Sequence, residues 1–322
     1  ARKSMRVAAI DCGTNSIRLL IADIDGNNFR EVVRDMEIVR LGQGVDQTGQ
    51  IHPDAITRTL AAVDKFAAEI AKRGVEKIRF CATSATRDAT NRHLFVDGVR
   101  ERLGIEPEVI SGDEEAALSF AGAIQDLDPS NGPFLVVDIG GGSTEFVFGT
   151  TSVEAARSVN IGCVRMSERH FANDPATAEQ IELARTDIQA AIAIAAAEVP
   201  ITQAKTLVAV AGTATTVTAA ALELNEYDRY AIHLARVTTS QTHDASTMFL
   251  TKTREQRLAL GYMHPGRVDV IAAGALVLSE IMKATGANEF ARRFTEGHFD
   301  LPMIGCSISL DGVLVVDKGV PC

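Results

Sequence analysis

The sequence predicts an α/β protein of two domains with an internally duplicated core. Two observations support this prediction: apolar strands alternate with amphipathic helices along the chain, and one glycine-rich hairpin occurs twice. The length of 322 residues also suits two domains, each able to bury its own core. The segment Asp128–Pro133 contains two prolines and a glycine and marks the boundary, so we expect domains at residues 1–127 and 128–322.

The first hairpin lies near the N-terminus. The apolar strand Val7–Asp11 ends in an aspartate, the turn Cys12–Ser16 follows, and Ile17–Ala22 returns as a strand. Glycine in such a turn lets the main chain approach a ligand closely, and successive N–H groups form a concave site for anions. The turn residues predicted to bind phosphate are Gly13, Thr14, Asn15 and Ser16.

The second hairpin repeats this design. Phe134–Ile139 is an apolar strand, three glycines and a serine form the turn, and Glu145–Phe148 returns as a strand. Aligning Asp11 with Asp138 also aligns the first glycine and the serine of the two turns, which indicates a duplication. Either turn alone could be only a turn, but the pair favours two phosphate-binding turns facing one cleft. The predicted residues of the second turn are Gly140, Gly141, Gly142 and Ser143.

The remaining elements alternate between strand and helix in both halves. In the first half we expect one or two strands in Phe29–Leu41, a helix from Pro53 to just before Gly74, a strand at Lys77–Ala82, a loop at Thr83–Ala89, a helix from about Asn91 to Gly104, a short strand ending at Ile110 and a helix from Asp113 to about Asp126. In the second half we expect a strand at Val153–Val159, a helix at about Ala176–Val199, a strand at Leu207–Val210, a turn at Ala211–Thr216 leading into a helix, and helices at Thr239–Leu250, Thr253–Leu260 and Asp269–Lys283. The tail from Ala291 shows no clear pattern.

Composition excludes several classes of protein. The net charge of −10 argues against a general nucleic-acid binder, and no uncharged apolar run is long enough to predict a membrane span. No signal peptide is visible, and five scattered cysteines without a Cys-x-x-Cys pair suggest neither a zinc site nor a disulfide framework, so we expect a cytoplasmic protein. The chain has no Walker A sequence and no Gly-x-Gly-x-x-Gly opening a helix, which argues against a standard P-loop NTPase or a dinucleotide enzyme.

Five ordered motifs resemble the exopolyphosphatase / guanosine pentaphosphate phosphatase (Ppx/GppA) family over about residues 5–290. These motifs are Asp11–Ser16, Thr83–Ala89, Ile110–Ala116, Asp138–Glu145 and Gly212–Thr213. The resemblance implies a duplicated actin-like, sugar-kinase-like (ribonuclease H-like) fold with an interdomain cleft, in the short two-domain form. After Phe290 the chain departs from the family pattern, so the tail is divergent, shifted by an insertion or foreign to the family, and no site residue is predicted there.

The resemblance also assigns a catalytic base. Glu114 and Glu115 both stand in the first turn of a predicted helix, where acids are ordinary because they favour the helix dipole. The family pattern selects Glu115 as the carboxylate that takes a proton from the attacking water. Gly212 and Thr213 are expected to add a third edge to the phosphate site, unless their turn only caps the helix that follows.

Arginines and aspartates near the motifs complete the predicted site. Arg87 follows a strand in a Thr/Ser-rich segment and could bind a phosphate through two N–H groups, although a surface ion pair with Asp88 or a neighbour is the alternative. Arg267 is a weaker candidate of the same kind, and His264 is more typical of a loop histidine. Phosphate chemistry favours Mg²⁺ or Mn²⁺, held first by Asp138 and second by Asp11, unless these aspartates only cap their turns.

The predicted activity is metal-dependent hydrolysis of the terminal phosphate of inorganic polyphosphate, with a preference for short chains and a homodimeric state. Hydrolysis of guanosine pentaphosphate is the alternative within the same class. An ATP-dependent kinase of the shared fold and a non-catalytic polyphosphate or nucleotide sensor are alternatives from other classes. No nucleic-acid or membrane partner is expected.

Overall fold

The computed structural model describes residues 4–25, 28–124, 127–292, 306–308 and 314–316. The described residues group into two compact units, the first drawn from Ala1–Gly122 with Glu296–Cys322 and the second from Ala123–Thr295. Each unit has its own central sheet and its own large hydrophobic core.

The sheet of the first unit has five strands in the order β3-β2-β1-β4-β5. The strands are β1 (Met5–Cys12), β2 (Ser16–Asp25), β3 (Asn28–Ile38), β4 (Lys77–Ala82) and β5 (Glu108–Val109). The first three form an antiparallel meander, and β4 and β5 continue the sheet parallel to β1. Because parallel strands end at the same edge of a sheet, the segments that follow β1, β4 and β5 meet there.

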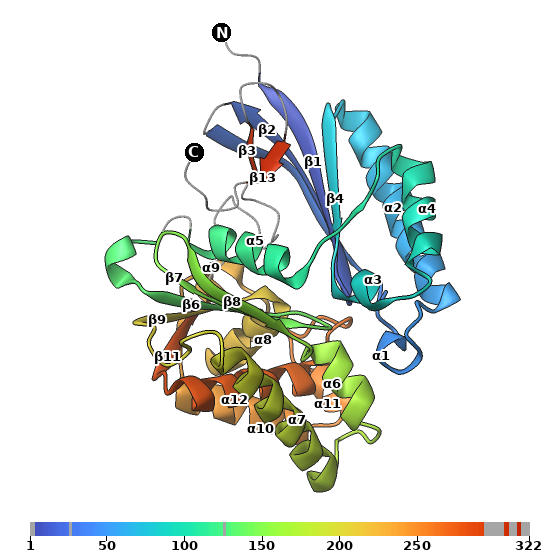
Figure 1. Ribbon diagram of the computed structural model, residues 1–322. Helices are drawn as coiled ribbons and strands as arrows, with labels where there is room; N and C mark the ends of the chain where they lie inside the picture. The colour runs from blue at the N-terminus through green and yellow to red at the C-terminus, as the bar shows by residue number, and fades with distance from the viewer. Residues whose placement is uncertain (1–3, 26–27, 125–126, 293–305, 309–313, 317–322) are drawn as a thin grey trace. The chain divides into compact units, whose positions relative to one another are not determined.

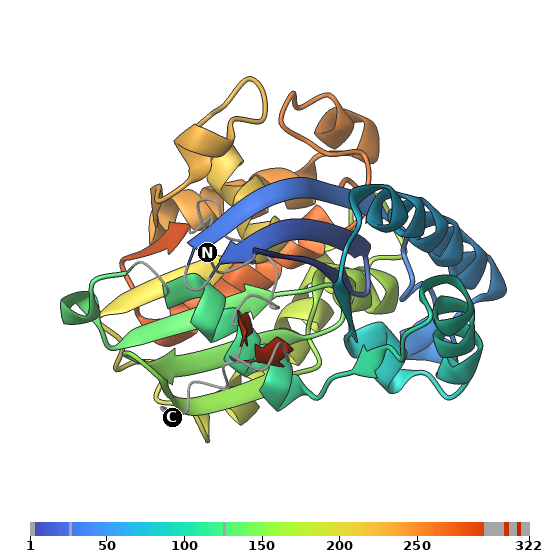
Figure 2. The same ribbon diagram turned by 90° about the horizontal axis from the view of Figure 1, so that it is seen from above.

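The helices of the first unit are α1 (Val45–Thr48), α2 (Pro53–Arg73), α3 (Ser84–Asp88), α4 (Arg92–Leu103) and α5 (Gly112–Ile124). Helix α2 begins with a proline and ends at Gly74, which has a positive φ of 65° that glycine adopts without strain. Helices α2 and α4 lie side by side (Figures 1 and 2) and bury Phe66 and Phe95 in one cluster with Phe80 of β4. The segment Thr83–Ala89, predicted as a loop, contains the short helix α3.

The sheet of the second unit has six strands in the order β10-β11-β9-β6-β7-β8. The strands are β6 (Phe134–Ile139), β7 (Thr144–Gly149), β8 (Val153–Val159), β9 (Thr206–Val210), β10 (Arg236–Thr238) and β11 (Glu289–Arg292). Strands β6, β7 and β8 form an antiparallel meander with β9 parallel to β6, which is the arrangement of β1, β2, β3 and β4. The predicted duplication is therefore confirmed.

The helices of the second unit are α6 (Cys163–His170), α7 (Ala178–Ala196), α8 (Ala211–Ala221), α9 (Arg229–Ile232), α10 (Thr239–Thr251), α11 (Arg254–Leu258) and α12 (Ile271–Thr285). Helix α12 is buried along almost its whole length and packs against α6, α7, α8 and α10 (Figure 1). The segment Ala211–Thr216, predicted as a turn, is the first part of α8. Strand β9 therefore passes into this helix without a loop.

The described part of the tail contributes β12 (Cys306–Ile308) and β13 (Leu314–Val316), which pair as a separate two-stranded sheet. Within the residues that the structure describes, no helix is both long and apolar enough for a membrane span. Cys12 and Cys81 are buried, and burial raises the pKa of the Cys81 thiol.

Candidate active site

The turn between β6 and β7 is anchored from one side by the start of α6. Each glycine carbonyl of the turn accepts at least one hydrogen bond from this segment. The bonds run from Cys163 N to Gly140 O (3.0 Å), from Val164 N and Arg165 N to Gly141 O (2.9 and 3.0 Å), and from Arg165 Nε to Gly142 O (2.7 Å). These bonds fix the orientation of three successive peptide planes.

That orientation presents a row of main-chain donors on the opposite side of the turn. In a planar trans peptide the C=O and the following N–H point in opposite directions, so the N–H groups of Gly141, Gly142 and Ser143 point away from α6. Among the described residues, none of these three N–H groups has a hydrogen-bond acceptor. Three adjacent unpaired donors form a concavity suited to a phosphate.

Gly162 permits the close approach of α6 to this turn. A Cβ atom at this position would lie 2.4 Å from the carbonyl carbon and oxygen of Gly141. Its φ of −151° is ordinary extended backbone, so the requirement for glycine is steric. Gly162 and Arg165 were not predicted as site residues. No residue near Gly162 in the sequence indicates its role, because its contact with Gly141 joins segments about 20 residues apart.

A pair of carboxylates stands where β6 enters this turn. Asp138 is directly opposite Glu145 in the β6–β7 ladder, and directly opposed residues of antiparallel strands share one face of the sheet. Their exposed fractions are only 7% and 1%, and Ser158 Oγ donates a hydrogen bond to Glu145 Oε1 at 2.7 Å. Glu145 belonged to a recognised motif but was not predicted as a site residue. Its position became visible only through the register of the hairpin.

Gly212 and Thr213 lie beside the same turn in the second unit. A Cβ at Gly212 would be 1.4 Å from Nη1 of Arg267, so the absence of a side chain makes room for this guanidinium. Burial raises the pKa of the Cys163 thiol, while Arg267 and a hydrogen bond with the Thr213 side chain act in the opposite direction. Since Cys163 N also bonds to Gly140 O, the structure brings Arg267, Gly212 and Thr213 together with the anchored turn. His264 shares the loop of Arg267, and burial and that arginine lower its pKa.

In the first unit, the segments after β1, β4 and β5 meet at one edge of the sheet. Thr83 N donates to Cys12 O at 3.1 Å, and Ile110 N donates to Ala82 O at 3.0 Å. These bonds place the turn Gly13–Ser16, helix α3 and the start of α5 beside one another.

The acids at the start of α5 point to different partners. Glu115 is 8% exposed and its Oε2 accepts a hydrogen bond from Arg87 Nη1 at 3.2 Å. Glu114 pairs instead with Arg79, at 3.2 Å between Nη2 and Oε1. Arg87 Nη1 also donates to the Ile110 carbonyl at 2.8 Å, and its Nε and Nη2 have no acceptor among the described residues. The structure therefore brings Arg87 and Glu115 together as an ion pair, so Arg87 does pair with another residue, although among the described residues that partner is not Asp88.

The turn Gly13–Ser16 is held like its counterpart in the second unit. Gly42 N donates to Thr14 O at 2.8 Å, and a Cβ at Gly42 would lie 2.1 Å from Cγ2 of Thr14. The hydroxyl of Thr14 is buried without a hydrogen-bond partner. A buried hydroxyl without a partner at a predicted phosphate turn is consistent with a missing ligand.

The paired carboxylates of the second unit fit a hard cation better than the single carboxylate of the first unit. Asp138 and Glu145 supply two carboxylates from opposed positions, and Mg²⁺ is commonly held by one or two carboxylates with substrate phosphates and water. Asp11 is opposite Arg18 in its ladder, so a cation already stands next to it. The described residues contain no group of three His, Cys, Asp or Glu side chains able to hold a metal by themselves.

Comparison with known proteins shows the family of this chain. A family profile described as "Ppx/GppA phosphatase family" matches residues 20–290. The chain belongs to this family. Its fold is the actin-like, sugar-kinase-like fold of Ppx/GppA proteins, as predicted. A second profile, described as "2,5-dihydroxypyridine 5,6-dioxygenase", matches only residues 270–322, most of which after Arg292 lie outside the described residues.

Individual Ppx/GppA relatives match from about half to nearly all of the chain. It is 44% identical to Exopolyphosphatase 2 of Mycobacterium tuberculosis over 95% of this chain and 99% of that protein. It is 36% identical to a guanosine-5'-triphosphate,3'-diphosphate pyrophosphatase of Vibrio atlanticus, over 53% of this chain and 34% of that protein. A crystal structure of an exopolyphosphatase-like protein matches with a TM-score of 0.87 and 42% identity, covering 94% of this chain and 98% of the other.

Proposed function

We propose that this protein is an exopolyphosphatase, which hydrolyses the terminal phosphoanhydride bond of inorganic polyphosphate. The observation that carries the proposal is the row of unpaired N–H groups at Gly141–Ser143, because it binds a phosphate oxygen through the main chain alone. The near full-length similarity to a protein named Exopolyphosphatase 2 supports the choice of substrate.

In the second unit the proposed role of the chain is to bind phosphate and to balance its charge. The N–H groups of Gly141, Gly142 and Ser143 bind the anion, and Gly212, Thr213 and Gly140 complete the backbone edge of the site. Arg267 supplies a positive charge beside Gly212. Fixed donors and charges of this kind stabilise developing negative charge without having to reorganise.

In the first unit the proposed role is to bind phosphate and to accept a proton. Gly13 closes the turn through its bond to Ser16 O, and Thr14, Asn15 and Ser16 contribute donors. Arg87 uses its Nε and Nη2 for a phosphate oxygen while Nη1 orients Glu115. Glu115 takes a proton from the attacking water as the new bond forms between water oxygen and terminal phosphorus. The bond to the bridging oxygen breaks, which gives orthophosphate and a chain shorter by one unit.

We propose Mg²⁺, or Mn²⁺, as the cofactor. Asp138 with Glu145 would hold it, and Asp11 is the second candidate. Such a cation neutralises phosphate charge and polarises the phosphorus–oxygen bonds when it is bound. A homodimeric state and a cytoplasmic location stay predictions, which sedimentation and cell fractionation would test.

Guanosine pentaphosphate is the second candidate substrate. Its terminal phosphoanhydride presents the same chemistry, and part of the chain is similar to a guanosine-5'-triphosphate,3'-diphosphate pyrophosphatase. The deciding assay measures phosphate release from short polyphosphate, long polyphosphate, guanosine pentaphosphate and ATP, with and without Mg²⁺. We expect release from polyphosphate to be fastest and to require the metal. Faster release from guanosine pentaphosphate would select the second candidate, and no release from any substrate would refute both.

A further inference from the structure

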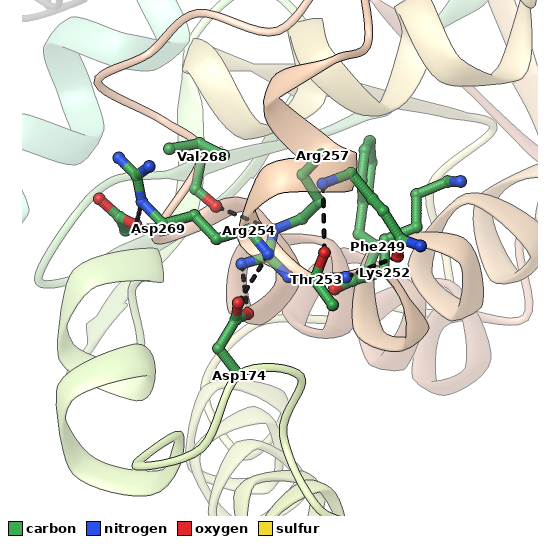
Figure 3. A network of polar contacts seen from close by, with 9 residues as sticks. Asp174, Phe249, Lys252, Thr253, Arg254, Arg257, Val268 and Asp269 are labelled. Carbon is green, nitrogen blue, oxygen red and sulfur yellow. Dashed lines mark hydrogen bonds and ion pairs between the residues drawn. The ribbon is translucent and has the colours of Figure 1, made fainter.

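An arginine that is almost completely buried lies next to the loop of Arg267. Arg257 of α11 is 5% exposed, and its guanidinium is hydrogen-bonded on three sides (Figure 3). The bonds run from Nε to Val268 O (3.0 Å), from Nη1 to Lys252 O (2.6 Å) and to Phe249 O (3.4 Å), and from Nη2 to Asp174 Oδ1 (2.7 Å). A buried charge is costly unless it is paired and hydrogen-bonded, as it is here.

A second arginine of α11 completes the network. Arg254 donates from Nε to Asp269 Oδ1 at 2.6 Å, and its main-chain N–H donates to Asp174 Oδ2 at 2.6 Å (Figure 3). Asp174 therefore accepts from both arginines. Burial raises its pKa, but the bonds from Arg254 N–H and Arg257 outweigh this effect, so the net pKa is lowered.

The two residues held by these arginines directly follow Arg267 in the chain. Arg257 bonds to the carbonyl of Val268, and Arg254 bonds to the side chain of Asp269. On the far side, the Arg267 carbonyl accepts from Ile271 N at 2.9 Å, where α12 begins. The main chain that follows Arg267 is thus held both by α11 and by the first turn of α12.

The position of this main chain decides where the guanidinium of Arg267 lies. The guanidinium occupies the space above Gly212, where even a methyl group would overlap it. A shift of the loop would therefore move the charge relative to the phosphate turn. Misplacement of a binding group by about 1 Å is enough to cost a large factor in rate.

We propose that Arg257, Arg254, Asp174 and Asp269 form a positioning network that holds Arg267 in place for phosphate binding. The inference rests on the proposed function of Arg267. Arg257 does not contact substrate in this proposal. It acts through the Val268 carbonyl.

A double-mutant cycle with Arg267→Ala tests this role. In the wild-type background we expect Asp174→Ala to lower kcat/KM by about 10-fold, because the loop loses its anchor. In the Arg267→Ala background the same change should lower kcat/KM by less than about 2-fold, because the group that the network positions is gone. An equal loss in both backgrounds would overturn the proposal, since it would show a general effect on folding. Arg254→Ala should behave like Asp174→Ala. Both of these side chains are half-exposed, so the test does not depend on an Arg257 variant that folds.

Arg185→Met is the matched control. Arg185 is also an arginine of the second unit, and it pairs with the buried Glu280 of α12, away from the Arg267 loop. Arg185→Met should lower the thermal stability, but its effect on kcat/KM should be the same in the wild-type and Arg267→Ala backgrounds. Coupling of the same size in this control would also overturn the proposal.

Hydrogen exchange provides a readout that does not need turnover. The N–H groups of Val270 and Ile271, which donate to the Arg267 carbonyl, should exchange faster in Asp174→Ala than in Arg185→Met. Unchanged exchange there would refute the network. If wild-type protein releases no phosphate, the proposed function fails, and the exchange measurement still decides whether the network holds the loop.

Discussion

Replacing Gly162 with alanine should strongly lower the activity by moving the turn that is proposed to bind phosphate. The added Cβ would lie 2.4 Å from Gly141 C and O and 2.6 Å from Gly142 N, whereas ordinary contacts begin at 3.4 Å. Relief of this overlap requires a relative shift of about 1 Å between α6 and the turn. The neighbouring atoms are backbone, so no side-chain rotation can absorb the shift.

The expected loss follows from this displacement. A misplacement of about 1 Å costs on the order of 10²-fold in rate, which corresponds to about 2.7 kcal/mol of transition-state stabilisation. Overpacking also costs about 1–3 kcal/mol of folding stability, so the assay must separate the two effects. Initial rates of phosphate release from a short polyphosphate should be measured well below the melting temperature, together with tripolyphosphate binding by calorimetry.

Gly98→Ala is the control for this substitution. A Cβ at Gly98 would also overlap a neighbour, at 2.6 Å, but that neighbour is the end of the Leu60 side chain, which can rotate. We expect Gly98→Ala to keep kcat/KM within about 2-fold of wild type, because this buried contact between α4 and α2 involves no residue of the proposed site. A folded Gly162→Ala protein with unchanged binding and turnover would show that the turn Gly140–Ser143 is not the phosphate site.

Four further predictions test the other assignments. Glu115→Gln should keep the fold and lower kcat by about 10²–10⁴-fold, and near-wild-type turnover in a folded protein would transfer the role of base to Glu114. Arg87→Ala should lower kcat/KM more than Arg87→Lys, and unchanged kinetics would exclude Arg87 from substrate binding. The pKa of Asp174 is lower in the folded protein than in the unfolded chain. Its ionised carboxylate therefore stabilises the fold above the unfolded pKa, and this contribution is lost as pH falls through the folded pKa. In an acid titration of unfolding, Asp174→Asn should show a smaller decline in stability below about pH 4 than wild type. Short polyphosphate should be preferred over long chains, because a net charge of −10 repels the distal chain over about 8 Å at physiological salt, and loss of long chains without intermediates on a gel would contradict this.

Much of the fold could be predicted because its signals are local. The apolar strands around each hairpin, and the proline and glycine at the ends of α2, lie within a few residues of the features that they determine. Helix α3 was predicted as a loop since five residues make little more than one turn, which is too short to show a helical period. The pairing of β10 with β11 was also missed, because it joins two residues that lie far apart in the sequence, Thr238 and Glu289.

The anchoring of the site could not be predicted because it depends on contacts between distant segments. Arg165 reaches Gly142 across 23 positions, and Arg257 reaches Asp174 across 83. In the sequence both arginines resemble ordinary charged residues of a solvated helix face. Their partners are mainly backbone carbonyls, which every residue has, so no residue pattern identifies these contacts.

The two hairpins preserve the backbone design while their charges have diverged. In both, the first glycine N–H bonds to the serine carbonyl, with Gly13 to Ser16 at 2.9 Å and Gly140 to Ser143 at 3.0 Å. In both, a later glycine packs against the turn.

The strand residue opposite the aspartate differs between the hairpins, since Asp11 faces Arg18 but Asp138 faces Glu145. The arginine opposite Asp11 offers a positive charge on the same face of the sheet, whereas Asp138 and Glu145 place two negative charges on one face, which a cation would favour. The duplication therefore supplies the two turns that are proposed to bind phosphate, and the divergence favours the second unit for the proposed metal. If this is correct, Glu145→Gln should weaken Mg²⁺ dependence more than Asp11→Asn does, and a stronger effect at Asp11, measured as the Mg²⁺ concentration for half-maximal phosphate release, would reverse the assignment.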